Sequence, residues 1–303
     1  MRKALEFFSF VLMVLFSLPF ALLPHTLSLK IGEGMGVVLY YIWTRRRLIA
    51  IENLRSAVSR GAVKIDSAPE TVIKQNFRNM GKSFVEIVKI YYGFGKKIFE
   101  RVEIRGIENY RNAQSKGKGI IAITGHCGNW ELNALASSTN LTRVNVVARA
   151  LNNSYLNKLM EKTRKKYGNT VIYKKGALKK ILSALKRNEA VVILMDQSVI
   201  SSEAVAADFL GKKDHIMKMP AIIARKTGSP VLPVFGRRVG KEYLIEIGDE
   251  IELDKAEDYE KAVYNDTIRF SGHIENYIKN NPTEWLWIHH RWKRDKSLSR
   301  EII

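Results

Sequence analysis

The chain has 303 residues, of which 46% are hydrophobic and 10% aromatic, so it can bury a substantial core. This composition excludes wholesale disorder, collagen-like chains and low-complexity chains. Lys and Arg number 50 against 30 Asp and Glu, and the resulting charge of +20 predicts anionic partners: nucleic acid, an acidic protein, phospholipid headgroups or a phosphorylated substrate. The single cysteine, Cys127, excludes an intramolecular disulfide and is typical of a reducing compartment.

An apolar run lies near the start of the chain. Phe7 to Leu23 carries no charge and follows Arg2 and Lys3. As a helix it would be about 26 Å long, slightly short of the roughly 30 Å hydrocarbon core of a bilayer. The run predicts a membrane anchor. A cleaved signal peptide is the alternative, which the length of the run and the lack of a clear small-x-small cleavage site disfavour.

A second apolar stretch, Met35 to Trp43, ends in the triple arginine Arg45–Arg47. Aromatic residues beside arginines are typical of a segment at a membrane interface. Between the two stretches, Gly32, Gly34 and Gly36 predict a flexible connector. Residues 1–43 are therefore expected to form an anchor or interfacial segment. If the first run spans the bilayer, the cationic body stays on the cytoplasmic side.

Residues 44–101 have helical periodicity and are expected to pack on the core. Arg45 to Val58 has apolar residues at helical spacing. A second helix is predicted over Pro69 to Tyr92, with Pro69 in its first turn and Gly93 after its end. Its apolar stripe comprises Ile73, Phe77, Met80, Phe84, Ile87 and Val88.

From residue 102 onward, short β-rich runs alternate with helical stretches. Strands are predicted at Gly119–Thr124, Arg143–Ala148, Thr170–Tyr173, Ala190–Met195 and Val231–Phe235, with one or two more in Tyr243–Leu253. Helices are predicted at Glu131–Ser138, Tyr155–Tyr167, Ala177–Arg187 and Lys218–Lys226, with a closing helix in Asp254–Lys279. This alternation predicts an α/β core over 102–303, with a mainly parallel central sheet flanked by helices.

The segment GIIAITGHCGNWEL, from Gly119 to Leu132, has the most suggestive chemistry. His126 follows a buried strand at its carboxyl end, where open α/β sheets bind ligands. On a continuous helix His126 and Glu131 would not share a face, so they can meet only if the chain turns at the glycines between them. The Glu131 carboxylate could then accept an imidazole N–H and leave the other nitrogen to take a substrate proton. A structural histidine beside a helix-dipole glutamate is an equally good interpretation.

The sequence resembles bacterial lipid A late acyltransferases, the lauroyl and myristoyl transferase family within the H-x4-D/E acyltransferases. HCGNWE is similar to that family's HFGNWE, and further collinear blocks cover nearly the whole chain: RRRLIAIENLRSA, NFRNMGKSFVEI, VEIRGIENY, VVARALNN, ILMDQ, DFLGKK, IARKTGSPVLPVF and PTEWLWIHHRWK. The chain departs from the family at Cys127, where phenylalanine is usual, and at Lys218–Ala221, where glycine-proline-alanine is frequent. Neither departure removes a proton-transfer group, and the acyl-chain length and the acceptor stay open.

The resemblance implies a role for each residue of the motif. His126 would be the general base that deprotonates an acceptor hydroxyl, and Glu131 would orient and polarise it. Backbone N–H groups near Gly128 and Asn129, at the predicted helix start, are candidate oxyanion donors. Cys127 could instead be a nucleophile, but a free cysteine is more often a small buried apolar residue.

Three further residues are candidates for substrate binding. Arg149 follows a predicted strand and would lie at the same sheet edge as His126, where it could bind phosphate in a bidentate manner. Arg164 matches a functional arginine of the resembled family, although a solvated basic helix face is an alternative. Asp196 matches the family's DQ and could pair with an arginine or position the acceptor, or could simply cap a loop.

A cluster of aromatic and basic residues near the C-terminus suits either lipid headgroups or core packing with exposed basic ends. It comprises Trp285, Trp287, His289, His290, Arg291, Trp292 and Lys293. The sequence has no G-x-S-x-G, P-loop or H-E-x-x-H motif, which removes support for a serine hydrolase, a P-loop NTPase or a zincin. No metal site and no cofactor are expected.

The resemblance therefore predicts a membrane-associated O-acyltransferase on the cytoplasmic face of the inner membrane, anchored through its N-terminus. It would move a fatty acyl chain from acyl-carrier protein, or from acyl-CoA, to a hydroxyl of an anionic glycolipid, a lipid A precursor. The acidic carrier protein suits the +20 charge. Acylation of a phosphatidylinositol mannoside or lysophospholipid is the alternative activity. A non-enzymatic basic membrane-binding protein is the alternative class, and no specific nucleic acid is expected.

Overall fold

The computed structural model describes residues 2–174, 176–240 and 242–294, so the last nine positions of the predicted core, 295–303, lie outside the described residues. The strands are β1 (Val102–Arg105), β2 (Ile120–Thr124), β3 (Val144–Ala148), β4 (Asn169–Tyr173), β5 (Ala190–Leu194), β6 (Ala204–Phe209), β7 (Lys212–Met217), β8 (Val231–Val239) and β9 (Glu242–Ile247). The helices before β2 are α1 (Arg2–Leu22), α2 (His25–Ile42), α3 (Thr44–Ser59), α4 (Pro69–Lys89), the π-helical η1 (Ile90–Phe94), α5 (Gly95–Phe99) and α6 (Ile107–Ser115). Those after β2 are α7 (Trp130–Asn140), α8 (Ser154–Lys166), α9 (Ala177–Lys186), α10 (Met219–Thr227) and α11 (Tyr259–Asn280), with short 3₁₀ turns η2 (Ser201–Glu203) and η3 (Arg291–Arg294).

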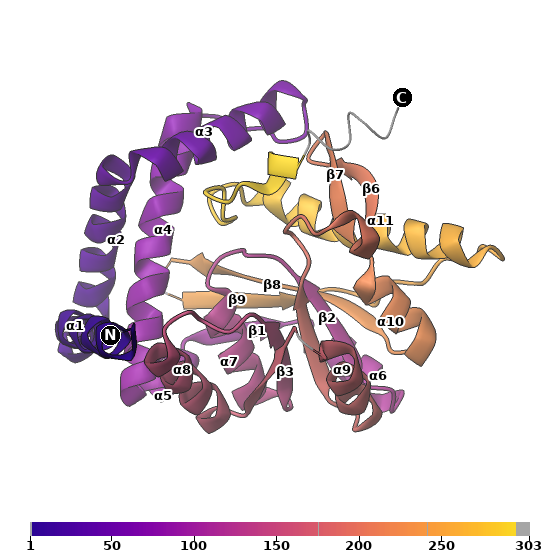
Figure 1. Cartoon of the computed structure of the whole chain (residues 1–303), viewed down its shortest axis with the longest axis horizontal. Coiled ribbons are helices and arrows are strands. Elements are labelled where there is room, and N and C mark those ends of the chain that lie inside the picture. The colour runs from indigo at the N-terminus through magenta and orange to yellow at the C-terminus, as the bar shows by residue number, and fades with distance from the viewer. Residues whose placement is uncertain (1, 175, 241, 295–303) are drawn as a thin grey trace.

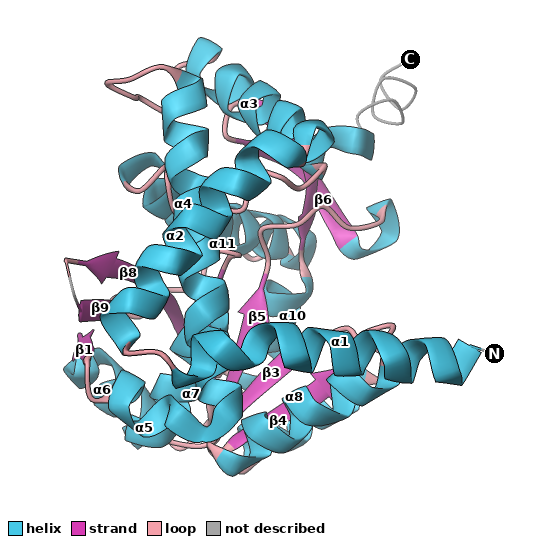
Figure 2. Cartoon of the chain, turned by 90° about the vertical axis from the view of Figure 1, so that its left-hand side faces the viewer, coloured by secondary structure: helices cyan, strands magenta, loops and turns pink. Residues whose placement is uncertain are grey.

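The main sheet has the order β1-β9-β8-β2-β5-β3-β4. Its strands are labelled in Figures 1 and 2. All of its neighbouring strands run parallel except β8 and β9, which form an antiparallel pair. β2 lies at the centre and is buried along its whole length, which explains its unbroken apolar sequence. The predicted α/β class with a mainly parallel sheet is therefore confirmed.

Helices cover both faces of this sheet. α7 packs on β3, β4 and β8, while α9, α10 and α11 pack on the other face. Alternate residues of β2 accordingly enter different cores: Ile121 and Ile123 join the larger cluster, and Ile120 joins the smaller one. The larger core also takes up apolar residues of α3 and α4, so these helices pack directly on the α/β body.

The sequence analysis does not predict β1, α6 or the β6–β7 hairpin of this region. The hairpin has a two-residue turn, Leu210-Gly211, in which both residues have positive φ, at 50° and 72°. Asparagine is the usual first residue of such a turn, whereas leucine seldom adopts a positive φ. Because leucine stands at that position here, the Asn-Gly signature is missing from the sequence. α11 also begins later than predicted, at Tyr259, because the Asp258 side chain accepts a hydrogen bond from the Lys261 N–H and caps the helix there.

The predicted flexible connector is wrong, because Gly32 and Gly36 lie inside α2 and contact α4. A Cβ added at Gly32 would lie 2.6 Å from the Gly81 carbonyl oxygen of α4, so only glycine permits this close approach. The predicted interfacial stretch is the C-terminal half of α2, and its exposed residues Tyr41 and Ile42 stand beside buried Tyr40. Figures 1 and 2 show α2 and α4 side by side.

α1 extends away from the rest of the molecule along α8 (Figure 2). It is long and apolar enough to cross a membrane, and it is mostly exposed. One face packs through Ser17 and Ala21, which are buried, while Leu5, Phe8, Leu12, Leu15, Phe16 and Leu22 are at least half exposed. Exposed apolar area of this extent on one helix face marks an interaction site.

Candidate active site

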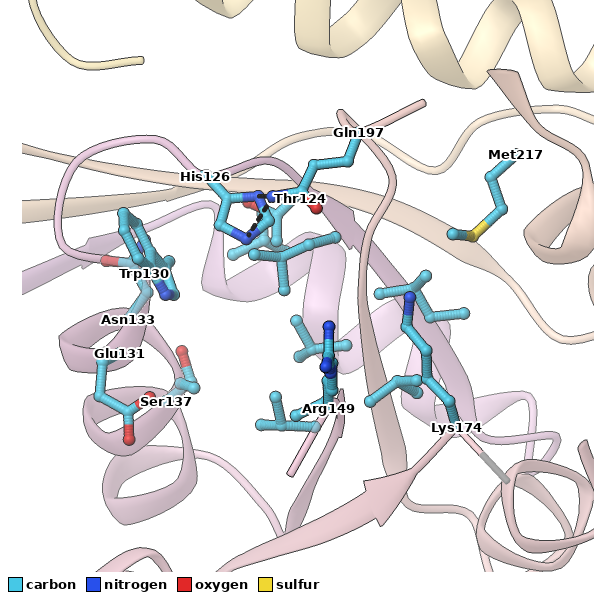
Figure 3. Close-up of a pocket in the computed structure, with 18 of the residues that line it drawn as sticks. Thr124, His126, Trp130, Glu131, Asn133, Ser137, Arg149, Lys174, Gln197 and Met217 are labelled. Atoms are coloured by element: carbon cyan, nitrogen blue, oxygen red, sulfur yellow. Dashed lines mark hydrogen bonds between the residues drawn. The ribbon is translucent and has the colours of Figure 1, made fainter. Parts of the chain in front are cut away.

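A cavity of about 370 Å³ opens at the carboxyl edge of the parallel strands (Figure 3). His126, Arg149, Lys174 and Gln197 line it, and they follow β2, β3, β4 and β5 respectively. Parallel strands place their carboxyl ends at one edge, so four segments far apart in the sequence meet here. Below these polar groups the wall is largely apolar, comprising Ala134, Val146, Val147, Ala148, Val192, Ile193, Leu194, Val199, Met217 and Val234.

His126 is paired with Asp196. The His126 Nδ1 lies 2.8 Å from Asp196 Oδ1, and the side chains are 21% and 2% exposed. A carboxylate accepts the Nδ1–H, so the neutral ring presents Nε2 as its basic nitrogen. The Gln197 side-chain nitrogen lies 3.3 Å from that Nε2, and the Trp130 ring packs edge-on against the imidazole. The imidazole is therefore fixed in tautomer and orientation.

The charges of the pair stabilise each other. Burial lowers the pKa of His126, but the charge and hydrogen bond of Asp196 outweigh burial and raise it above 6.5. Burial likewise raises the pKa of Asp196, yet His126 and the Trp285 N–H outweigh it and hold that pKa far below its usual range. Asp196 therefore stays anionic and can stabilise an imidazolium that forms when His126 takes a proton.

The predicted contact between Glu131 and His126 is wrong. No hydrogen bond joins them in the described part of the chain; Glu131 instead accepts from Arg164 Nε at 2.8 Å and Nη2 at 2.7 Å. Glu131 lies in the first turn of α7 and its side chain turns away from His126 toward α8 (Figure 3). The Tyr91 hydroxyl, from η1, donates to the same carboxylate at 3.0 Å. The structure thus gives the orienting position to Asp196, and Glu131 and Arg164 form a second buried pair in the cavity wall.

The backbone groups expected to bind an oxyanion are already used. The Gly128 N–H donates to the Glu284 carbonyl at 2.8 Å, and the Asn129 N–H donates to the Tyr243 hydroxyl at 2.7 Å. Asn129 is the N-cap of α7, as expected, because its side chain accepts from the Leu132 N–H. Gly128 has φ +55° and packs against the Gly236 carbonyl, so a larger residue cannot replace it. Both residues therefore shape the turn after His126 rather than contact the cavity as donors.

The C-terminal segment 282–291 holds the loops that carry His126 and Asp196. Leu286 N–H donates to the His126 carbonyl at 3.0 Å, and Trp285 Nε1 donates to Asp196 Oδ2 at 2.8 Å. Arg291, 1% exposed, donates to the Asp196 carbonyl. The segment is held in turn by side chains of α3 and α4: Arg46 and Asn53 donate to its carbonyls, and so does Asn76. The tryptophans Trp285 and Trp287 are accordingly buried, which agrees with core packing.

Three residues beside the cavity were missed as site candidates. Lys174 and Gln197 each follow a strand, so the rule that placed Arg149 at this edge could have found them. Tyr91 carries no such signal, because it follows a predicted helix and reaches Glu131 only through tertiary packing. Arg149 and Lys174 are exposed cations on the rim and have no ion pair within the described residues.

Cys127 is 1% exposed, and burial raises the pKa of its thiol well above 9. Thiolate is the nucleophilic form of cysteine, so this environment suppresses such chemistry. Its side chain belongs to the same apolar core as Trp285. An isolated β-bridge also joins the backbones of these two residues.

Known proteins with similar sequences are acyltransferases. The lipid A biosynthesis palmitoleoyltransferase of Escherichia coli (strain K12) is 23% identical over 274 residues, which cover 89% of this chain and 86% of that protein. The lipid A biosynthesis lauroyltransferase of the same strain is 24% identical over 277 residues, with 89% and 87% covered. A phosphatidylinositol mannoside acyltransferase of Mycobacterium tuberculosis (strain ATCC 25618 / H37Rv) is 22% identical over 255 residues, with 82% and 79% covered.

Among solved structures, the crystal structure of a 1-acyl-sn-glycerophosphate acyltransferase from Thermotoga maritima matches at 15% identity with a TM-score of 0.37. The match covers 77% of this chain and 97% of that one. The family model described as bacterial lipid A biosynthesis acyltransferase matches residues 2–294, nearly the whole chain. The chain therefore belongs to the bacterial lipid A biosynthesis acyltransferase family, and it is an acyltransferase.

Proposed function

We propose that this enzyme is a membrane-associated O-acyltransferase that moves a fatty acyl chain from an acyl thioester, carried on acyl-carrier protein or CoA, to a hydroxyl of a lipid A precursor. The observation that carries the proposal is the pairing of partly exposed His126 with buried Asp196, with Nδ1 and Oδ1 2.8 Å apart at the edge of a largely apolar cavity. This pair is a general base with its tautomer fixed, which is what the activation of a hydroxyl requires.

In the proposed reaction the acceptor hydroxyl gives its proton to His126 Nε2 while its oxygen attacks the thioester carbonyl carbon. The C–S bond then breaks, and the leaving thiolate takes the proton back from the imidazolium. Asp196 remains ionised throughout and stabilises the imidazolium. The ester forms directly, so no covalent acyl-enzyme is needed, in agreement with the buried thiol of Cys127.

The cations at the rim favour anionic substrates. Arg149 and Lys174 line the cavity beside His126, and both are exposed. Phosphate groups of a lipid A precursor, of CoA or of the phosphopantetheine arm of a carrier protein would find a complementary charge there. Arg164 differs from them because Glu131 already neutralises it in the wall.

A second, apolar cavity supports a lipid substrate. It measures about 460 Å³ and lies between α1, α4 and α8. Its lining comprises Phe10, Met13, Val14, Ser17, Phe84, Ile87, Val88, Tyr91, Tyr92, Leu156, Leu159 and Met160. Tyr91 lines this cavity and bonds to Glu131 of the first one, so the two cavities adjoin. An acyl chain lying along α1 would therefore reach the catalytic edge.

The decisive experiment is reconstitution of the purified full-length enzyme with a defined donor and acceptor. Acyl-carrier protein or CoA thioesters of several chain lengths are offered with a lipid A precursor, a phosphatidylinositol mannoside or a lysophospholipid, and new esters are identified by mass spectrometry. We expect transfer to the lipid A precursor from the wild type and a rate about 10⁴-fold lower from His126→Ala. Preferred transfer to another acceptor would reject the proposed substrate while keeping the chemistry.

A phosphatidylinositol mannoside as the acceptor has support of its own, because a mycobacterial phosphatidylinositol mannoside acyltransferase matches 82% of this chain. The lipid A relatives match over more of the chain, at 89%. We therefore rank the mannoside second, and the acceptor competition decides between them.

Membrane association is tested separately on the exposed face of α1. We expect Leu12→Gln, Leu15→Gln and Phe16→Gln together to release the protein from vesicles, because these side chains are 50–60% exposed and would be buried in lipid. Substitution here spares the packed face of α1, so the variant should fold as the wild type does. Unchanged sedimentation with vesicles would contradict the membrane proposal.

A further inference from the structure

A crevice outside the catalytic region lies where α1 ends and α2 begins. It has a volume of about 320 Å³ and is lined by the turn of residues 21–25 together with Lys89, Phe94, Lys97, Ile98 and Arg101. It shares no residue with the cavity that contains His126. The proposed acyl transfer makes no use of it.

The polar side chains of the crevice are all basic. Among the described residues that line it, Lys89, Lys97, Arg101 and His25 carry the ionisable side chains and none is acidic. Lys97 and Arg101 are exposed and form no ion pair within the described chain. Two unpaired cations on one small concave surface repel each other and are stabilised by a bound anion.

Lys89 is the buried member of this set. It is 5% exposed, and its Nζ donates to the carbonyls of Ala21 and Leu23 at 3.0 and 2.5 Å. These bonds cap the end of α1 and use two of the three N–H donors of the Lys89 ammonium group. Within the described residues no carboxylate is paired with Lys89, so its charge adds to the positive potential of the crevice.

His25 reports this potential. Its Nδ1 is buried without a hydrogen-bond partner in the described structure. Burial, followed by the charges of Arg101, Arg238 and Lys89, lowers the pKa of His25 to about 4. Every charge that acts on it is positive, and Arg238 is itself paired with Glu86 at 2.7 Å.

The rim of the crevice is apolar and exposed. Leu22 is 68% exposed and Phe94 is 41% exposed, and both line it. The crevice thus joins a basic interior to apolar edges at one end of the exposed apolar helix α1. A soluble anion needs only the charges, whereas a phospholipid uses both features, because its phosphate and its hydrocarbon are covalently joined.

We propose that this crevice binds the phosphate of a membrane phospholipid headgroup, with Lys97 and Arg101 as its principal ligands and Leu22 and Phe94 against the adjoining hydrocarbon. The site would hold α1 and the α1–α2 turn at the depth of the headgroups. It is distinct from the acceptor site of the proposed acyl transfer, and it would remain if that activity proved to be different.

The first test compares two variants of the full-length protein that each lose two exposed cations. Lys97→Gln with Arg101→Gln alters the crevice, and Lys179→Gln with Lys180→Gln on α9 is the control for lost charge. Binding is measured to vesicles of phosphatidylcholine with and without one fifth phosphatidylglycerol. We expect the crevice variant to lose about tenfold in its preference for the anionic vesicles and the control about twofold or less. Equal losses in the two variants would overturn the proposal.

The second test removes the contribution of α1 by using a monomeric probe. Dihexanoyl-phosphatidylglycerol below its micelle concentration should bind the detergent-purified wild type at saturable 1:1 stoichiometry, about tenfold more tightly than inorganic phosphate. The crevice variant should lose this binding while keeping the wild-type melting temperature. Equal affinity for inorganic phosphate would overturn the lipid assignment in favour of a free anion, and undiminished lipid binding by the variant would overturn the site.

Discussion

Two largely buried side-chain pairs lie at the cavity that contains His126, and they are built in different ways. His126 and Asp196 follow the neighbouring parallel strands β2 and β5 and are fixed by the backbone of the sheet. Glu131 and Arg164 join two helices, α7 and α8, through a bidentate contact. The first pair can accept a proton, whereas the second is a neutralised ion pair whose guanidinium stays charged. His126 and Glu131 are thus neighbours in one sequence motif, but the pairing of strands β2 and β5 brings His126 into contact with Asp196, which lies 70 residues away in the chain.

The largest expected effect comes from His126→Ala, which removes the proposed base. We expect a fall in kcat of about 10⁴, the upper end of the range for general base catalysis. Steady-state transfer with the purified enzyme measures it, and an unchanged melting temperature serves as the control. Turnover within tenfold of the wild type would exclude His126 as the base.

Asp196→Asn tests the first pair through the pH dependence of turnover. His126 must be neutral to accept a proton, so the rate rises with pH through its pKa, and Asp196 places that limb above 6.5 in the wild type. Without the carboxylate, burial lowers the pKa of His126 unopposed. The rising limb of the pH profile should therefore move to lower pH, while kcat falls by about 10³. A pH profile of kcat measures both. A limb that stays in place would show that Asp196 does not set the basicity of His126.

Glu131→Ala tests the second pair. We expect about a 10²-fold loss of transfer, because unpaired Arg164 leaves the cavity wall and substrates lose their alignment. Breaking a buried pair should also lower the free energy of unfolding by about 3–5 kcal/mol, measured by chemical denaturation. The acid limb of the pH profile should remain in place, unlike that of Asp196→Asn. A shifted limb would instead return Glu131 to the role that its sequence position suggested.

Trp285→Phe keeps an aromatic side chain, although a smaller one, and removes the N–H that donates to Asp196 at 2.8 Å. A hydrogen bond to a charged group contributes about 1.5–3 kcal/mol, and the lower end of that range corresponds to the fall of about tenfold in kcat that we expect, with little change in KM. Trp287→Phe is the matched control, because Trp287 Nε1 donates to the Pro282 carbonyl in the same segment. Equal losses in both variants would mean that the segment acts only through folding.

The smallest effect is expected for Cys127→Ala. The thiol is buried and its pKa is raised, so the substitution should change kcat by less than about threefold, with a modest loss of stability from the smaller side chain. Turnover is compared with thermal unfolding. Loss of activity together with a trapped acyl thioester on the wild type would replace direct transfer with a covalent mechanism.

Local patterns in the sequence were enough to predict most strands and helices of the α/β core. Strand and helix alternation predicted β2, β3, β4, β5 and β8 and the helices between them, because a covered parallel sheet imposes its own apolar pattern. The same pattern placed Arg149 at the edge where His126 emerges. The resemblance to the acyltransferase family was confirmed by the match over residues 2–294, and the alternative of a non-enzymatic binding protein is wrong.

Tertiary structure alone decided which charges meet. Hydrogen bonding depends on positions fixed to within a few tenths of an ångström, and these come from strand register and helix packing rather than from spacing in the chain. In the folded chain His126 is hydrogen-bonded to Asp196, and Glu131 is hydrogen-bonded to Arg164. The backbone N–H groups of Gly128 and Asn129 donate to other partners. Tertiary structure also turned the glycines of the expected connector into a helix contact, because two backbones can approach closely only where Cβ atoms are absent. The sequence alone determined the fold class and the chemical groups available, and packing determined which of them act together.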